Sequence, residues 1–200
     1  ILEALHDLEI DNPTEIQISA IPTMSEGKDI IGQAQTGTGK TFAYGIPLLS
    51  KIEGNSKNIQ ALVLCPTREL SLQVSNELLK LIRYKSNINI ATIYGGESYE
   101  KQMKALRLKP QIVVGTPGRI IDHMNRKTLN FDLLKILVLD EADEMLKMGF
   151  QEDLETILSR TPSNRQTALF SATMPDFIKK VALKYQNDPV HIIVKKKTLT

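Results

Sequence analysis

The sequence predicts an open α/β sandwich, in which a doubly wound, mostly parallel sheet carries helices on both faces. Three observations predict this class. Short apolar runs alternate along the chain with longer stretches of helical spacing, which is the order of β-α-β units. The apolar runs are continuous, as expected of strands that are buried on both faces. A glycine-rich segment, residues 34–41, separates the first run from a helical stretch, where doubly wound folds bind phosphate groups.

The elements follow from this alternation. Two helices are expected first, at residues 1–8 and 15–24, with Thr14 as the N-cap of the second and Gly27 after its end. The expected strands are residues 29–31, 61–65, 90–94, 111–114, 136–139, 167–170 and 191–194. The expected helices between them are residues 40–52, 68–84, 99–106, 117–125, 150–158 and 176–185. Residues 1–194 are therefore expected to form one domain, and residues 195–200, with three consecutive lysines, to begin a linker.

Composition and charge limit the classes of function. The net charge of +2 permits a nucleic-acid partner and does not indicate one. Cys65 is the only cysteine, which excludes an internal disulfide and agrees with a cytoplasmic location. No apolar stretch approaches the length of a membrane span, so no membrane partner is expected. The histidines, at 6, 123 and 191, lack the spacing of metal ligands and are expected to be structural or surface residues.

The glycine-rich segment has the pattern of a phosphate-binding loop at a strand-to-helix junction. Its residues are Ala34, Gln35, Thr36, Gly37, Thr38, Gly39, Lys40 and Thr41. The two glycines let backbone N–H groups turn toward a polyphosphate, and the next helix points its N-terminus at the same anion. Lys40 is expected to reach the outer phosphates of ATP, and the Thr41 hydroxyl to bind Mg²⁺. The alternative is a glycine-rich turn that fits the pattern by chance.

An acidic cluster follows the apolar run at residues 136–139. Asp140 is expected to hold Mg²⁺, directly or through water, opposite Thr41. Glu141 is expected to orient and deprotonate the water that attacks the γ-phosphate. The alternative is an acidic cluster that the dipole of a helix N-terminus favours. We expect the lysine-threonine pair and the acidic pair to leave neighbouring strands and to share one magnesium ion.

Two weaker signals accompany these motifs. The hydroxyls of Ser171 and Thr173 are expected to bond the Asp143 carboxylate and so couple nucleotide state to loop position. Ordinary turn chemistry is the alternative explanation for these hydroxyls. Gln17 carries an amide that can both donate to and accept from an adenine edge, which would select ATP over GTP.

Three further strand ends predict a second polyanion. Their residues are Pro66, Thr67 and Arg68; Gly95 and Gly96; and Thr116, Pro117, Gly118 and Arg119. In the first and third, a threonine can cap a helix whose first turn holds an arginine. A cation is unfavourable there unless an anion is bound. Capped helices with a stray arginine are the alternative, but three such sites on one sheet edge favour a nucleic-acid backbone, held without a base code.

The order of these motifs resembles the first RecA-like domain of a DEAD-box ATP-dependent RNA helicase. The resemblance runs from Pro13 to Thr173 and includes the segments 13–17, 34–41, 66–70, 95–96, 116–119, 140–143 and 171–173. It implies ATP-driven, non-processive separation of short RNA duplexes or remodelling of RNA–protein complexes. It also implies that Thr14 and Gln17 belong to the ATP pocket, and that the helix opening at Pro117 bends one RNA strand.

The chain departs from the family pattern before Pro13. Glu9 and Ile10 stand where the family usually has a glycine and an aromatic residue, and the family's adenine-stacking aromatic would lie before Ile1. The resemblance implies a second RecA-like domain with arginine fingers after about Thr200, so the chain alone is expected to bind nucleotide weakly and turn it over slowly. The rival functions are another phosphate-loop motor that acts on DNA and a non-catalytic RNA clamp. RNA preference rests on the resemblance alone.

Overall fold

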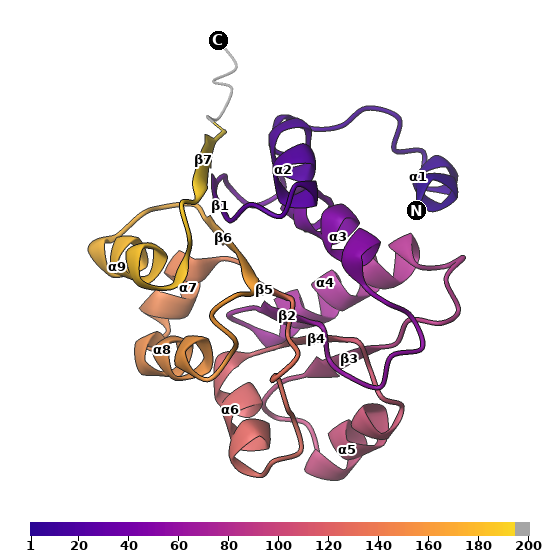
Figure 1. The fold of residues 1–200 in the computed structure, drawn as a ribbon, viewed down its shortest axis with the longest axis vertical. Coiled ribbons are helices and arrows are strands. Elements are labelled where there is room, and N and C mark those ends of the chain that lie inside the picture. The colour runs from indigo at the N-terminus through magenta and orange to yellow at the C-terminus, as the bar shows by residue number, and fades with distance from the viewer. Residues whose placement is uncertain (195–200) are drawn as a thin grey trace.

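The computed structural model describes residues 1–194 as alternating strands and helices (Figure 1). The strands are β1 (Ile30–Gln33), β2 (Ala61–Leu64), β3 (Ile90–Ile93), β4 (Ile112–Gly115), β5 (Ile136–Leu139), β6 (Gln166–Ser171) and β7 (Val190–Ile193). The helices are α1 (Leu2–Asp7), α2 (Glu15–Ser25), α3 (Lys40–Lys51), α4 (Arg68–Leu81), α5 (Tyr99–Arg107), α6 (Pro117–Asn125), α7 (Ala142–Lys147), α8 (Gln151–Ser159) and α9 (Asp176–Tyr185). Helix α7 was not predicted, since it has only six residues and begins inside the acidic cluster. The linker predicted at residues 195–200 lies outside the described residues.

The strands form one seven-stranded sheet in the order β3-β4-β2-β5-β6-β1-β7, and every pair is parallel. The predicted doubly wound α/β class is therefore confirmed. The central strands β2, β4, β5 and β6 are buried along their whole length, as their continuous apolar runs predict. The edge strands β3 and β7 are only partly buried.

The core lies in two layers, one on each face of the sheet. On the first face, Ile30, Val63 and Val138 pack with apolar residues of α2, α3 and α4. On the second face, Leu62 and Leu139 pack with apolar residues of α6, α7, α8 and α9. Successive strand residues therefore face opposite layers, and the helices before β3 cover a different face from those after it (Figure 1).

The crossover connections determine where crevices can open at the carboxyl edge of the sheet. The chain runs toward β3 through α3 and α4 on the first face, and it returns toward β7 through helices on the second face. A crevice forms where adjacent strands lead to helices on opposite faces. Such pairs are β1 and β6, β2 and β4, and β2 and β5, so the edge can open beside β1 and on both sides of β2.

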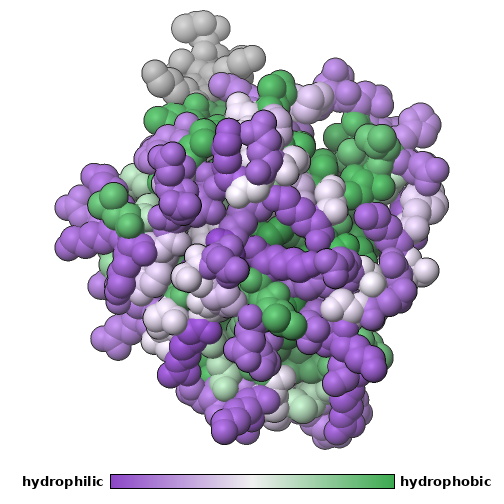
Figure 2. All heavy atoms as spheres, in the orientation of Figure 1, coloured by the Kyte–Doolittle hydropathy of each residue, from purple (hydrophilic) through white to green (hydrophobic). Residues whose placement is uncertain are grey.

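The surface is mainly hydrophilic. On the face drawn in Figure 2, apolar side chains form separate patches among polar and charged ones. The exposed large apolar residues include Leu2 of α1, Leu133 before β5 and Leu183 of α9, which belong to different parts of the chain. Within residues 1–194, no helix has the length and apolar character that crossing a membrane requires.

Candidate functional site

Strand order sorts the candidate motifs into two groups along the carboxyl edge. Adjacent strands β5, β6 and β1 end in the acidic motif (140–143), the hydroxyl motif (171–173) and the glycine-rich loop (34–41). Adjacent strands β3, β4 and β2 end in the segments 95–96, 116–119 and 66–68. The candidate nucleotide residues and the candidate nucleic-acid residues thus occupy separate parts of one edge, which the sequence alone does not predict.

The glycine-rich loop and the acidic motif meet across the end of β6. We predicted that the two motifs leave neighbouring strands. This prediction is wrong, because β6 lies between β5 and β1. The side chains nevertheless converge: Lys40 Nζ lies 4.0 Å from Asp140 Oδ1, and Thr36 Oγ1 donates to Glu141 Oε1 at 3.1 Å. These four residues and Thr41 line one cavity of about 440 Å³. All five residues therefore lie on the same side of the sheet edge, which is necessary if they are to contact one ligand.

The loop conformation depends on its glycines. Gly37 and Gly39 have φ values of 82° and 86°, which glycine adopts without strain. A Cβ atom on Gly39 would lie 2.6 Å from Nε2 of Gln17, so the position also lacks room for a side chain. Lys40 is buried at the start of α3, and its Nζ donates to the Ala34 carbonyl at 3.3 Å. The Lys40 side chain thus folds back over the glycine-rich loop that precedes it.

Asp140 is a buried carboxylate with one bonded and one unbonded oxygen. Tyr44 OH donates to Oδ2 at 2.9 Å, whereas Oδ1 is buried and has no hydrogen-bond partner among the described residues. Burial raises the pKa of Asp140, and Lys40 and the Tyr44 hydroxyl lower it in part. Sequence reasoning missed Tyr44, although it lies four residues after Lys40 and therefore on the same side of α3.

The unbonded oxygen of Asp140 fits a hydrated cation. Mg²⁺ takes oxygen ligands, keeps several waters and is usually held by one or two carboxylates together with phosphates. Asp140 and Thr41 supply a carboxylate and a hydroxyl to the same cavity. Within the described part of the chain, no group of three or more His, Cys, Asp and Glu residues could hold a metal ion. An ion here would therefore depend on phosphate and water for most of its ligands.

Glu141 has a left-handed backbone, with φ and ψ both 52°. Such a conformation is uncommon for a residue other than glycine and often occurs at functional sites. It places Glu141 at the start of α7, with its half-buried carboxylate toward Thr36 of the glycine-rich loop.

The hydroxyl motif holds Asp143 through several hydrogen bonds. Thr173 donates to Asp143 Oδ2 from its hydroxyl at 2.8 Å and from its backbone N–H at 3.0 Å. The Ser171 hydroxyl differs from expectation, since it accepts from the Asp143 backbone N–H and donates to the Thr173 carbonyl. Burial alone would raise the pKa of Asp143, but hydrogen bonds to the carboxylate, chiefly that from the Thr173 hydroxyl, outweigh it, so the pKa is lowered.

Gln17 links α2 to the glycine-rich loop. Its Oε1 accepts from the Thr14 backbone N–H at 2.9 Å, and its Nε2 donates to the Gly39 carbonyl at 3.1 Å. The side chain is buried and does not line the cavity. Each end of the amide keeps one further hydrogen-bonding position. An adenine contact would have to use those positions.

The cavity is lined by several residues that sequence reasoning did not select. They are Leu8, Ile10, Phe42, Gln73, Glu77 and Lys80. Leu8 and Ile10 flank Glu9, whose φ of 55° explains why a glycine would suit that position. No motif marks the residues from α4, because they reach the cavity only through the packing of α4 against α3.

The second group of motifs forms one connected surface. The guanidinium of Arg68 lies over the ring of Tyr94, 5.0 Å from its centroid, directly beside the exposed Gly95 and Gly96. Arg119 Nη1 donates to the Glu97 carbonyl at 3.0 Å. The segments 66–68 and 116–119 therefore each contact a residue that flanks Gly95 and Gly96.

The two threonines in this group differ. Thr67 caps α4, because its Oγ1 accepts from the Leu70 backbone N–H at 3.2 Å. Thr116 occupies the N-cap position of α6, but its side chain makes no capping hydrogen bond. Pro117 follows at the first position of the helix, as predicted. The capping role predicted for the Thr116 side chain is therefore wrong.

A doubly wound parallel sheet with a glycine-rich loop and an acidic motif at one cavity defines the class of phosphate-loop domains. Within that class, the chain belongs to the DEAD/DEAH box helicase family, whose sequence profile matches residues 14–181. The resemblance to the first RecA-like domain of a DEAD-box helicase is confirmed.

Relatives and solved structures agree with this assignment. The chain is 52% identical over its whole length to ATP-dependent RNA helicase CshA of Listeria monocytogenes, of which it covers 38%. It is 54% identical over 198 residues to ATP-dependent RNA helicase DeaD of Mycobacterium tuberculosis, of which it covers 35%. The crystal structure of a DEAD box protein from Methanococcus jannaschii superposes with a TM-score of 0.93 at 46% identity, over 98% of this chain and 53% of that one. The chain therefore spans little more than a third of the length of CshA and of DeaD.

Proposed function

We propose that this chain is the ATP-binding and RNA-backbone-binding half of an ATP-dependent RNA helicase. The observation that carries the proposal is the 4.0 Å approach of Lys40 to Asp140 in a cavity that Thr41 and Glu141 also line. The relatives CshA and DeaD are named ATP-dependent RNA helicases, which supports the same activity here.

The residues around the cavity have distinct roles in this proposal. Lys40 exchanges the Ala34 carbonyl for the outer phosphates of ATP, and Gln17 contacts the adenine. Thr41 and Asp140 would hold Mg²⁺, which neutralises phosphate charge when bound. Glu141 orients the attacking water and accepts its proton. Its left-handed backbone and its bond from Thr36 keep the carboxylate beside the glycine-rich loop.

The connected surface at the crevice between β2 and β4 binds the RNA backbone. Backbone N–H groups at the start of α4 and α6 and the arginines beside them contact phosphates, so binding does not depend on base sequence. The helix that opens at Pro117 bends one strand and so separates a short duplex. Asp143 in the first turn of α7 and Thr173 after β6 are joined by a hydrogen bond, and this pair transmits the nucleotide state.

Full activity requires a second RecA-like domain. The chain covers 38% of CshA, which leaves room in such a protein for a further domain. An arginine finger supplied by another element is worth about 10³–10⁵ in turnover. We therefore assign unwinding or remodelling to the two-domain protein and nucleotide and RNA binding to this half.

Stimulation of ATP hydrolysis by different nucleic acids tests the proposal. In the full-length protein, single-stranded RNA is expected to raise the ATPase rate well above the rate without nucleic acid, and DNA of the same sequence is expected to raise it little. Equal stimulation by DNA would favour a DNA motor. RNA binding without any ATP hydrolysis would favour a non-catalytic clamp.

A further inference from the structure

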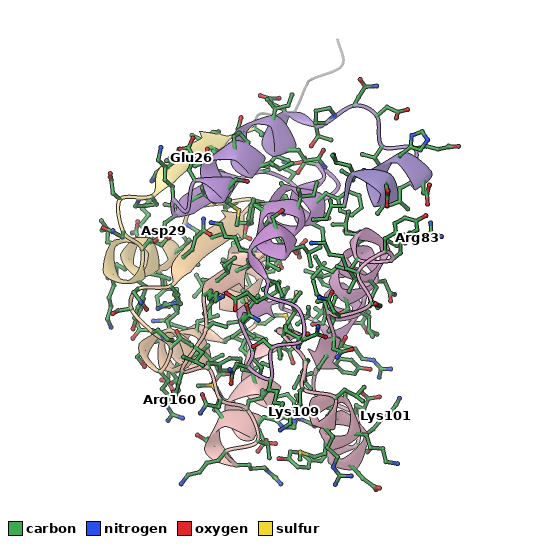
Figure 3. The ribbon with its side chains drawn as sticks, turned by 45° about the vertical axis from the view of Figure 1, so that its right-hand side comes forward. Glu26, Asp29, Arg83, Lys101, Lys109 and Arg160 are labelled. Carbon is green, nitrogen blue, oxygen red and sulfur yellow. The ribbon has the colours of Figure 1, made fainter. Side chains whose placement is uncertain are left out.

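A buried amide lies beneath the connected surface and joins its segments. Gln102, on α5, is only 1% exposed. Its Oε1 accepts from Arg119 Nη1 at 3.1 Å and faces His123 Nε2 at 2.9 Å, and its Nε2 donates to the Tyr94 carbonyl at 2.7 Å. Neighbouring Lys101 lies on the outer side of α5 and pairs with Glu97 (Figure 3). Gln102 therefore makes its contacts inside the protein.

Its partners fix the orientation of the amide. A carbonyl only accepts hydrogen bonds and a guanidinium only donates them, so the amide nitrogen must face Tyr94 and the oxygen must face Arg119. The same oxygen requires a proton on Nε2 of His123. In the neutral ring, Nδ1 is then an acceptor 2.8 Å from the Thr128 hydroxyl, which also lies within donating distance of the His123 carbonyl at 3.0 Å. The ring also stacks on Tyr99, with centroids 4.5 Å apart. Gln102 thus has one stable arrangement.

Two of these partners belong to separate candidate RNA segments. Tyr94 immediately precedes Gly95 and Gly96, and its ring lies under Arg68. Arg119 ends the segment 116–119 and also donates to the Glu97 carbonyl. We infer that Gln102 is a positioning residue that fixes Arg119 relative to the Gly95–Gly96 turn, so that both segments contact successive parts of one RNA backbone. This inference rests on the proposed function.

A second buried glutamine provides a matched control. Gln111 lies directly before β4, at the amino-terminal edge of the sheet, and is 2% exposed. Its Oε1 accepts from the Asn89 backbone N–H at 2.8 Å, and its Nε2 donates to the Lys109 and Ser56 carbonyls. Replacing either glutamine by methionine removes a buried amide of the same size. Only Gln102→Met removes one that touches the candidate RNA surface.

The test measures RNA affinity in the full-length protein, with a fluorescent single-stranded oligouridylate and a non-hydrolysable ATP analogue. Gln102→Met is expected to weaken RNA binding by about tenfold, equivalent to about 1.4 kcal/mol. It should also make the affinity less dependent on salt, because Arg119 no longer points at a phosphate. Gln111→Met should leave both quantities unchanged, and neither variant should alter affinity for the ATP analogue.

Arg119→Ala separates the two ways in which the account can fail. If Arg119→Ala weakens RNA binding and Gln102→Met behaves like Gln111→Met, the positioning role is wrong and the RNA site stands. If Arg119→Ala has no effect either, the RNA site itself is wrong. Should Gln102→Met not fold, Gln102→Glu keeps the oxygen that Arg119 and His123 use, loses the donor to Tyr94 and adds a buried carboxyl group, which Gln111→Glu adds as well. A loss of RNA affinity relative to Gln111→Glu supports the inference, and equal affinities overturn it.

Discussion

At the scale of single residues, the environment of Asp140 fixes the position and the free oxygen of its carboxylate in the cavity. Its carboxylate is buried, receives one hydrogen bond from Tyr44 and keeps Oδ1 free toward Lys40. Burial raises the pKa of Asp140 and also that of Tyr44. The tyrosine therefore keeps its proton and acts as a permanent donor, which holds the carboxylate in one orientation.

Removal of the Tyr44 hydroxyl is expected to destabilise the protein. Tyr44→Phe leaves Oδ2 of the buried Asp140 carboxylate without a donor, at a cost of about 1–3 kcal/mol. For a chain of this size each kcal/mol lowers Tm by about 2–4 °C, which thermal unfolding followed by circular dichroism measures. Tyr99→Phe is the control, because its hydroxyl contacts only the neutral Thr128 and should cost less. A Tm for Tyr44→Phe at or above that of the control would contradict this role.

The sequence predicted residues whose types are tied to phosphate chemistry, such as Lys40, Thr41, Asp140 and Glu141. It did not predict Tyr44 or Gln102. Their contacts reach Asp140, 96 positions away in the chain, and Arg119, 17 positions away. Such partners are set by the packing of separate elements, and no local pattern records them.

At the scale of elements, α5 and α6 are joined by a polar cluster that contains His123. The ring is completely buried, and both its nitrogens lie within hydrogen-bond distance of protein groups. Burial lowers the pKa of His123, Arg119 and Arg126 lower it as well, and Asp122 raises it in part. The folded protein therefore favours the neutral ring.

This histidine is expected to make stability fall with acidification. An unfolded chain binds a proton at a histidine near pH 6.5, whereas folded His123 binds it only at lower pH. Stability is thus complete above that value and decreases as the pH falls through and below it. Thermal unfolding between about pH 7.5 and pH 5.5 measures the effect. His123→Gln should reduce the pH dependence of Tm, and His191→Gln, at an exposed position, should not. Equal slopes of Tm against pH in the unchanged protein, His123→Gln and His191→Gln would show that His123 does not contribute to the pH dependence.

Element order also limited what the sequence could predict. The alternation of apolar runs and helical stretches predicted each strand and all helices except α7. It did not predict that β6 lies between β5 and β1. Strand order depends on which face each crossover helix covers, and this is settled by the complementary packing of the two core layers. The sequence alone therefore did not establish that the glycine-rich loop and the acidic motif lie together. The strand order of the structure was needed as well.

At the scale of the whole molecule, the direction of the crossovers gives one sheet edge room for two candidate binding regions. Helices on opposite faces leave adjacent strands at β1–β6 and on both sides of β2, so one sheet edge can open at more than one place. The candidate nucleotide residues follow β5, β6 and β1, and the candidate RNA residues follow β3, β4 and β2.

A polypeptide of residues 1–200 alone is expected to hydrolyse ATP slowly. It has the lysine, the acidic pair and the candidate RNA surface, but it would lack the arginine fingers that we propose for a second domain. RNA-stimulated turnover should fall by about 10³–10⁵ relative to the full-length protein, as measured by phosphate release. Turnover comparable with that of the full-length protein would refute this division between the two domains.

The central claim is that the loop of Lys40 and Thr41 and the pair Asp140 and Glu141 form one site of ATP hydrolysis. The most direct measurement is RNA-stimulated phosphate release by Glu141→Gln in the full-length protein, together with its affinity for ATP. Glu144→Gln is the control, since Glu144 lies on α7 and pairs with Lys147. Hydrolysis by Glu141→Gln should fall by about 10²–10⁴ while ATP still binds. Turnover close to that of Glu144→Gln would contradict the claim.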